Sequence, residues 1–159
     1  MNRTNSANNG TSWEAQIQRT CDDYERRGLA RIRKVSPPTR TIGKGQVIYL
    51  ENPFVDFIGC LKGGRMVALE AKSTAGPRLA IGGESGLTQK QIEAMLRWES
   101  MGAKVGLLWQ CTSVCNAWVD LAVIRHALTL GDKSIMLKDA HGITQGTGYA
   151  TADFLPYLV

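Results

Sequence analysis

Long hydrophobic runs, histidine and cysteine are scarce in this 159-residue sequence. No stretch approaches the roughly 18 apolar residues of a membrane-spanning helix, and the polar amino terminus lacks a signal-peptide core. We therefore expect a cytoplasmic protein with no membrane partner. The two histidines have no partners at metal-ligand spacing, which argues against a histidine-based metal site. The four cysteines are irregularly spaced and predict reduced thiols rather than a disulfide framework.

Acidic residues are also in the minority, and the basic excess is concentrated in one part of the chain. Lys and Arg number 19 against 14 Asp and Glu, a net charge of +5. A large share of the positive charge lies between Arg19 and Lys44, which favours a polyanionic partner, although a solvated basic face is the alternative. The length and the 43% hydrophobic content predict one domain over residues 10–159, after a flexible arm over residues 1–9.

Periodicity and turn residues predict an α/β order of elements. Residues 39–52, with basic residues and glycines, predict a protruding loop or hairpin that returns to the body of the domain. Other segments predict helices over 11–28 and 88–102, strands over 29–35, 54–61, 65–71, 103–109, 116–123 and 133–137, and a terminal turn or helix over 153–158. This order is typical of a central mixed sheet flanked by helices.

Three ionisable residues, Asp56, Glu70 and Lys72, interrupt otherwise apolar strands. Because successive side chains in a strand point to opposite faces, Glu70 and Lys72 share a face, and the Ala71 carbonyl lies along the strand edge. A two-residue glycine turn would pair Asp56 with Ala71. A three-residue loop over residues 62–64 would instead pair Asp56 with Glu70, their side-chain origins roughly 5 Å apart. Our hypothesis is the three-residue loop.

Two carboxylates at this separation repel each other unless a cation lies between them. Oxygen ligands beside a lysine favour Mg²⁺ or Mn²⁺ over zinc. The alternative is an ordinary ion pair between Glu70 and Lys72, with Asp56 merely preceding a strand. The spacing of these residues leaves both interpretations open.

The order Asp56, then Glu70-Ala71-Lys72, resembles the PD-(D/E)xK nuclease motif, with Val55 where the motif's name has proline. The surrounding sequence resembles the RecU family of Holliday junction resolvases, from about Asn9 to the carboxyl end. The segments that carry the resemblance are 9–14, 34–39, 55–59, 69–72, 91–93, 133–135 and 153–158. The resemblance implies a restriction-endonuclease-like α/β fold, a central mixed sheet flanked by helices, with a short projecting basic hairpin or stalk.

The resemblance also implies a metal site. Asp56, Glu70 and the carbonyl of Ala71 would bind Mg²⁺, for which Mn²⁺ would substitute, and Glu14 would contribute directly or through water. A glutamate in the first turn of a helix is also favoured by the helix dipole, which is a purely structural explanation for Glu14.

The remaining implied roles concern catalysis and DNA. Lys72 would position the attacking water and stabilise charge on the phosphate, and Gln91, with Gln89 as its competitor, would support the metal ligands. The reaction would leave 5′-phosphate and 3′-hydroxyl ends. Symmetric cutting of a four-way junction implies a homodimer. The candidate DNA-binding residues are Arg31, Arg33, Lys34, Arg40 and Lys44.

The sequence departs from the family pattern in two places. Thr88 and Lys90 stand where RecU proteins tend to have histidines, and the stalk segment 39–52 is shorter than in the cellular enzymes. The shorter stalk leaves open a related phage-encoded or archaeal-type resolvase with similar chemistry. Two alternatives to a resolvase remain: another PD-(D/E)xK endonuclease with a restriction or repair role, and a non-catalytic accessory protein that binds junctions.

Overall fold

The computed structural model describes residues 4–49, 55–112, 115–143 and 152–159. Side chains are described from Ser12 onward, apart from that of Tyr49. The helices are α1 (Thr4–Arg26), α2 (Gln89–Ser100) and α3 (Leu121–Thr129), with short 3-10 helices η1 (Leu137–Asp139) and η2 (Leu155–Tyr157). The strands are β1 (Ala30–Lys34), β2 (Thr39–Ile42), β3 (Gln46–Tyr49), β4 (Phe57–Leu61), β5 (Met66–Thr74), β6 (Arg78–Ala80), β7 (Lys104–Cys111), β8 (Cys115–Asp120), β9 (Ser134–Met136) and β10 (His141–Gly142).

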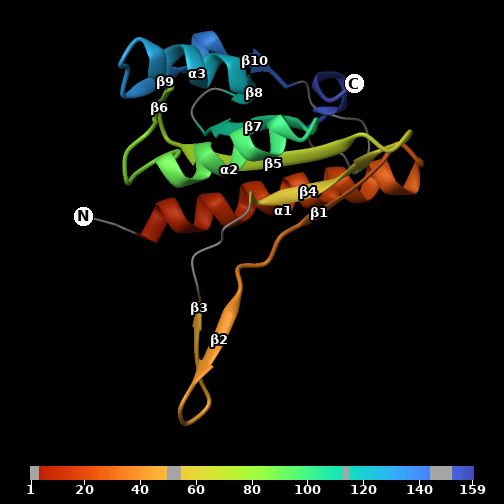
Figure 1. The fold of residues 1–159 in the computed structure, drawn as a ribbon, viewed down its shortest axis with the longest axis vertical. Helices are drawn as coiled ribbons and strands as arrows, with labels where there is room; N and C mark the ends of the chain where they lie inside the picture. Colours follow the sequence, from red (N-terminus) through yellow and green to blue (C-terminus); the bar gives the residue numbers. More distant parts are fainter. Residues whose placement is uncertain (1–3, 50–54, 113–114, 144–151) are drawn as a thin grey trace.

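The central sheet has six strands in the order β1-β4-β5-β7-β8-β10 (Figure 1). Strands β5 and β7 are parallel, and the other neighbours are antiparallel. A parallel pair needs a crossover connection, and α2 provides it between β5 and β7. The predicted mixed sheet is therefore confirmed.

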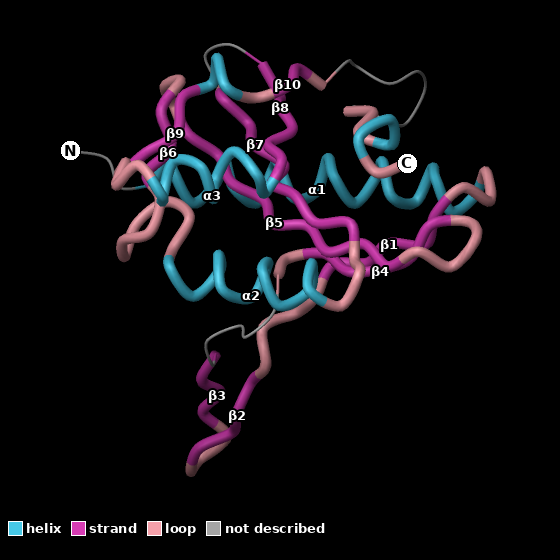
Figure 2. The backbone as a smooth tube through the Cα atoms, turned by 45° about the horizontal axis from the view of Figure 1, so that its top comes forward, coloured by secondary structure: helices cyan, strands magenta, loops and turns pink. Residues whose placement is uncertain are grey.

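Helices cover both faces of the sheet (Figures 1 and 2). On one face, α1 packs its buried residues Trp13, Ile17, Cys21 and Tyr24 against the strands. On the other face, α2 and α3 pack over a second group of buried side chains. The helical spacing of the α1 residues is the pattern of an amphipathic helix with one core-facing side.

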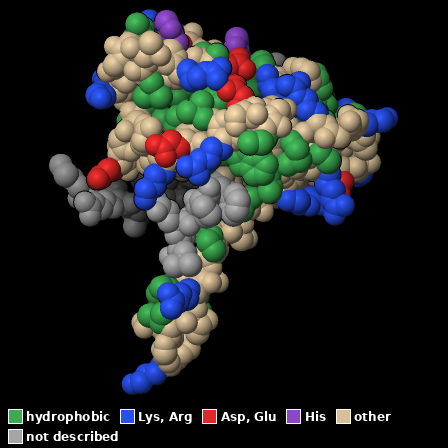
Figure 3. Space-filling view, in the orientation of Figure 1, with side chains coloured by type: hydrophobic (Ala, Val, Ile, Leu, Met, Phe, Trp, Pro, Cys, Tyr) green, Lys and Arg blue, Asp and Glu red, His purple; other side chains and the backbone are tan. Residues whose placement is uncertain are grey.

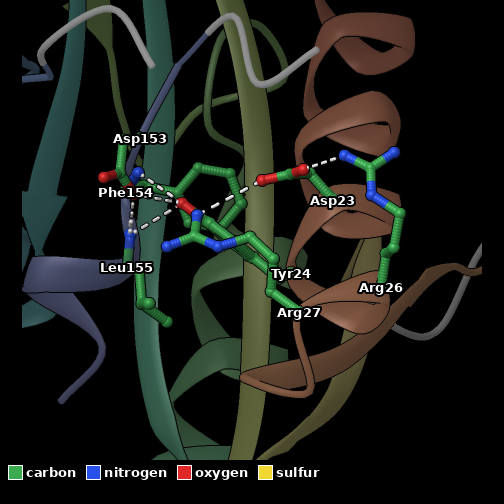
Figure 4. Close-up of polar contacts among 7 residues, drawn as sticks. All are labelled: Asp23, Tyr24, Arg26, Arg27, Asp153, Phe154 and Leu155. Carbon is green, nitrogen blue, oxygen red and sulfur yellow. Dashed lines mark hydrogen bonds and ion pairs between the residues drawn. The ribbon is translucent and has the colours of Figure 1, made fainter. Parts of the chain in front are cut away.

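The carboxyl-terminal segment is attached to the end of α1 through Tyr24 (Figure 4). The Tyr24 hydroxyl donates to Asp153 Oδ1 at 2.6 Å and accepts the backbone N–H groups of Phe154 and Leu155, each at 2.9 Å. The Tyr24 and Phe154 rings meet edge to face, with centroids 5.3 Å apart. Residues 152–158 thus complete the core on the α1 side of the sheet.

Strands β2 and β3 form a hairpin that projects from the body and belongs to a separate two-stranded sheet (Figure 1). Its turn has positive φ at Lys44 (65°) and Gly45 (75°), a conformation that glycine adopts readily. Lys and Arg side chains and hydrophobic side chains both lie on its surface (Figure 3). The protruding hairpin is confirmed for residues 39–49, and the rest of the predicted segment 39–52 lies outside the described residues.

The predicted start of the first helix was wrong. We expected it after Gly10, but α1 begins at Thr4, so residues 4–9 of the expected arm are helical. Asn and Gly lower helix propensity by up to about 1 kcal/mol each but do not forbid extension of a helix already nucleated by packing. Residues 1–3 lie outside the described residues.

Helix α3 was missed. The expected strand over 116–123 ends at Asp120, and a helix begins at Leu121. Its buried residues Leu121, Ile124 and Ala127 follow each other every three positions, which is a helical spacing. The apolar residues up to Val123 were predicted to continue the strand, but packing of residues 121–129 over the sheet favours a helix instead. No helix in the described ranges is long and apolar enough to cross a membrane.

Candidate active site

The β4–β5 hairpin has the register that the three-residue loop predicted. Cα partners run from Phe57↔Leu69 to Cys60↔Met66, and the Leu61 N–H donates to Arg65 O at 2.9 Å. The loop over residues 62–64 contains two glycines with φ of 98° and 91°, which other residues rarely adopt. Continued by one position, this register sets Asp56 opposite Glu70.

Glu70 is fully buried, which is unusual for a carboxylate. Its Oε1 accepts from the side-chain amide of Gln91 and lies 3.0 Å from Lys72 Nζ. Its Oε2 is buried and has no hydrogen-bond partner in the described part of the chain. A buried oxygen without a partner is costly to keep, so this atom is available to a ligand.

Asp56 lies directly before β4, opposite Glu70 on β5. Its Oδ2 accepts the N–H of Ala71 at 2.9 Å. Burial is the main reason that the pKa of Asp56 is raised, and the Glu14 carboxylate raises it further, against the opposing effects of the Ala71 N–H and the Lys72 ammonium. The structure thus brings Asp56, Glu70 and Lys72 together, with Glu14 within electrostatic reach.

Burial raises the pKa of Glu70 to about 8, and the negative charge of Asp56 adds to the shift. In the absence of a cation, this raised pKa favours the protonated form of Glu70 at neutral pH. A divalent cation between the two carboxyl groups would replace this proton, because it stabilises both negative charges.

Gln91 lies in the first turn of α2 and contacts Glu70 as well as the helix cap. Its Oε1 accepts the backbone N–H of Thr88 at 3.1 Å, while the Thr88 hydroxyl accepts the N–H of Gln91 at 3.3 Å. This reciprocal capping box holds the Gln91 amide at Glu70. Its competitor Gln89 instead donates to Glu93 on the exposed face of α2.

Glu14, on α1, is paired with a lysine. Its Oε2 lies 2.5 Å from Lys34 Nζ, at the end of β1. In the described ranges, no three His, Cys, Asp or Glu side chains converge on one point as a ready metal site. The pairing of Glu14 with Lys34 was not predicted, because α1 and β1 meet only in the folded chain.

The donors present nevertheless fit a hard divalent cation. Asp56, directly before β4, and Glu70, on the neighbouring strand β5, offer carboxylate oxygens, and the backbone carbonyl of Ala71 follows Glu70 directly. Mg²⁺ prefers oxygen ligands and needs only one or two carboxylates, because water and substrate phosphate complete its shell.

The basic candidates separate into two groups. On β1, Arg31 pairs with Glu25 at 3.4 Å, and Arg33 pairs with Asp22 at 2.8 Å and also with Glu25. Asp22 and Glu25 share one face of α1, and the two arginines share one face of β1, so the pairs form where the helix lies along the strand. Much of this positive charge is neutralised within the protein.

The second group lies on the projecting hairpin. Arg40 is in β2 and Lys44 is in the turn, and both are exposed. Neither has an ion pair with a carboxylate in the described part of the chain. Among the candidate DNA-binding residues, Arg40 and Lys44 on the hairpin are therefore the ones whose charges are available to a polyanion.

Comparison with known proteins identifies the family. The family model of RecU, described as Recombination protein U, matches residues 8–116. No curated protein shows significant sequence similarity to the chain. The chain's fold is similar to that of Hjc from Archaeoglobus fulgidus, described as a Holliday junction resolvase from an archaeal hyperthermophile. The TM-score is 0.56 at 13% identity, covering 84% of this chain and 95% of the archaeal chain. With a family model matching more than half its length, this chain belongs to the RecU family of recombination proteins.

Proposed function

We propose that this RecU-family protein is a Holliday junction resolvase: a metal-dependent endonuclease that makes paired symmetric cuts in four-way DNA junctions. The observation that carries the proposal is the fully buried Glu70, which lies beside Asp56 and Lys72 and whose Oε2 has no hydrogen-bond partner in the described residues. In its ionised form, a buried carboxylate oxygen without a hydrogen-bond donor is costly to keep. A cation ligand is a function that accounts for it.

Asp56, Glu70 and the Ala71 carbonyl would hold Mg²⁺, with Mn²⁺ as a substitute, and Glu14 would complete the set. When bound, the ion would supply a more acidic water and stabilise the leaving 3′-oxygen. Gln91 supports this arrangement, since its amide N–H fixes one oxygen of Glu70 and leaves the other free.

Lys72 would act on the reacting phosphate. Its side chain is one-fifth exposed, so its ammonium group borders both the buried carboxylate and the surface where DNA would lie. There it would orient the attacking water and stabilise charge on the phosphoryl oxygens, leaving a 5′-phosphate and a 3′-hydroxyl.

DNA binding would depend most on the projecting hairpin. Arg40 and Lys44 carry charges that no carboxylate neutralises in the described residues, and they lie on the hairpin that projects from the central sheet. Residues 10–159 would form one nuclease domain that includes this hairpin. Arg31, Arg33 and Lys34 would contact phosphates only by exchanging their carboxylate partners. Because two symmetric cuts need two sites, we expect a homodimer, acting in the cytoplasm where its DNA substrate lies.

The test is cleavage of a labelled synthetic four-way junction and a matched linear duplex by the wild type and by Asp56→Asn, in Mg²⁺ or EDTA. Paired symmetric nicks in the junction alone, lost in EDTA and in the variant, are expected. Junction binding without cleavage would overturn the catalytic proposal in favour of an accessory role. Cleavage of the linear duplex would favour a restriction or repair endonuclease.

A further inference from the structure

The contact between Lys34 and Glu14 connects the chain segment that leads to the projecting hairpin with the candidate active site. Lys34 is the last residue of β1, and its Nζ lies 2.5 Å from Glu14 Oε2 on α1. The next turn of α1 contributes a second contact, because the Lys34 N–H donates to Gln18 Oε1 at 3.3 Å. On the other side, the N–H of Val35 donates to the carbonyl of Asp56 at 2.7 Å.

The charges in this region fall into two pairs. Lys72 faces Glu70 at 3.0 Å, and Lys34 faces Glu14 at 2.5 Å, with Asp56 close enough to feel the charge of Glu14. Although Glu14 is near Asp56, it does not converge with Asp56 and Glu70 within the described part of the chain. Its carboxylate is occupied by Lys34 instead.

Lys34 is also accessible from outside. Its side chain is 45% exposed, against 20% for Lys72 and 28% for Glu14. The chain passes from Lys34 through two prolines to β2 of the projecting hairpin, so DNA held by the hairpin would lie close to this ammonium group. An exposed ion pair contributes little free energy, and a DNA phosphate can therefore replace the carboxylate at small cost.

We propose that Lys34 is a positioning residue that holds Glu14 away from the metal in the DNA-free protein and releases it when a junction phosphate binds Lys34. The inference rests on the proposed function. It makes the two binding events mutually supportive, because DNA frees a carboxylate for the cation and the cation frees a lysine for DNA. DNA binding at Lys34, next to the projecting hairpin, would thereby determine whether Glu14 joins the metal ligands.

Metal affinity measured without DNA tests the first half of the proposal. Mn²⁺ is titrated calorimetrically into the wild type, Lys34→Met, Lys34→Arg, Glu14→Gln and the double variant Lys34→Met/Glu14→Gln. Lys34→Met should bind Mn²⁺ roughly two- to fivefold more tightly, the range that an exposed ion pair can account for. Lys34→Arg should match the wild type, because arginine keeps the pair. Lys138→Met, which removes an exposed lysine in η1, is the matched control and should have no effect.

The double variant separates a specific contact from a general charge effect. If Lys34 acts through Glu14, then Lys34→Met changes nothing in the Glu14→Gln background. An equal increase in both backgrounds would mean that any nearby positive charge repels the metal, and it would overturn the proposal. Unchanged or weaker Mn²⁺ binding by Lys34→Met alone would also overturn it.

Junction affinity in EDTA tests the second half without any cleavage. Glu14→Gln should bind a four-way junction more tightly than the wild type, and this gain should disappear when Lys34 is also replaced by Met. If Glu14→Gln still raises junction affinity when Lys34 is already Met, the proposed exchange of Glu14 for a DNA phosphate at Lys34 is overturned. If the wild type binds no Mn²⁺ at all, the proposed nuclease function fails, whereas normal Mn²⁺ binding that is insensitive to Lys34 defeats only this inference.

Discussion

Glu70 Oε1 accepts a hydrogen bond from the side-chain amide of Gln91, and this bond connects the middle of the sheet to the first turn of α2. The same glutamine caps the helix through Thr88. Helix α2 is thereby fixed to the only fully buried carboxylate in the described part of the chain. The orientation of Glu70 depends on a residue that would itself touch neither metal nor DNA.

Replacing Gln91 by Leu should weaken Mn²⁺ binding about tenfold, because supporting residues around metal ligands typically contribute that much or more. Calorimetric titration measures the change. Gln91→Glu keeps an acceptor for the Thr88 N–H but loses the donor to Glu70, so it should also bind metal weakly while retaining helix stability. Gln89→Leu alters only an exposed contact with Glu93 and serves as the control. Equal loss in the Gln89 and Gln91 variants would contradict this prediction.

The stability of the metal-free protein should fall as pH rises from about 4.5 to about 8. The pKa of Glu70 is 4.5 in its ordinary state and about 8 in the folded protein. Between these values the folded state binds more protons than the unfolded state, so raising the pH favours unfolding. Asp56, whose pKa is also raised, acts in the same direction. Melting temperatures in EDTA from pH 5 to pH 9 measure the slope.

Glu70→Gln is the matched control for this pH dependence, because it removes the titrating group. Its melting temperature should vary less with pH than that of the wild type over the same range. Mn²⁺ should stabilise the wild type more at pH 8 than at pH 6, since the cation no longer has to displace a proton. Parallel pH profiles for wild type and variant would show that Glu70 is not the group responsible.

Loss of the two hairpin cations should reduce the salt dependence of junction binding. For Arg40→Ala/Lys44→Ala, the slope of log affinity against log salt should become shallower by about 1.8, the value for two released counterions. Arg31→Ala/Arg33→Ala removes the same charge, but those arginines are already paired with Asp22 and Glu25, so its slope should change less. Filter binding in EDTA at several salt concentrations measures both. Identical changes in the two double variants would refute the distinction.

Tyr24→Phe should destabilise the protein by about 2 kcal/mol in urea unfolding, because it removes the acceptor for the Phe154 and Leu155 N–H groups and the donor to Asp153. Tyr157→Phe loses only a more exposed bond to the Gly142 carbonyl and should cost about half as much. Mn²⁺ affinity should be unchanged in both variants. A Tyr24→Phe protein as stable as the wild type would show that water replaces the hydroxyl.

The features that the sequence predicted correctly are those determined by local chemistry. The register between Asp56 and Glu70 follows from the three-residue loop with its two glycines, and the start of α2 follows from Thr88 as a helix cap. Both depend on backbone preferences of a few consecutive residues. The resemblance to RecU proteins then implied that Asp56 and Glu70 bind a metal ion in a nuclease site.

The features that could not be predicted depend on contacts between distant segments. The pairing of Lys34 with Glu14, and of Arg33 with Asp22, requires α1 to lie along β1, and no local pattern specifies which carboxylate meets which cation. Helix α3 was missed for a related reason. A short apolar run fits either a strand or a helix, and its packing over the sheet decides.

The separation of the β2–β3 hairpin from the central sheet has a consequence for its dynamics. A two-stranded hairpin is marginally stable by itself in water, and Ile42, Val47 and Ile48 are all partly exposed on this one. Its backbone amides should therefore exchange hydrogen with solvent through inexpensive local opening, while those of β5 and β7 exchange only when the domain unfolds. Because the central sheet does not stabilise the hairpin, a bound partner would have to do so.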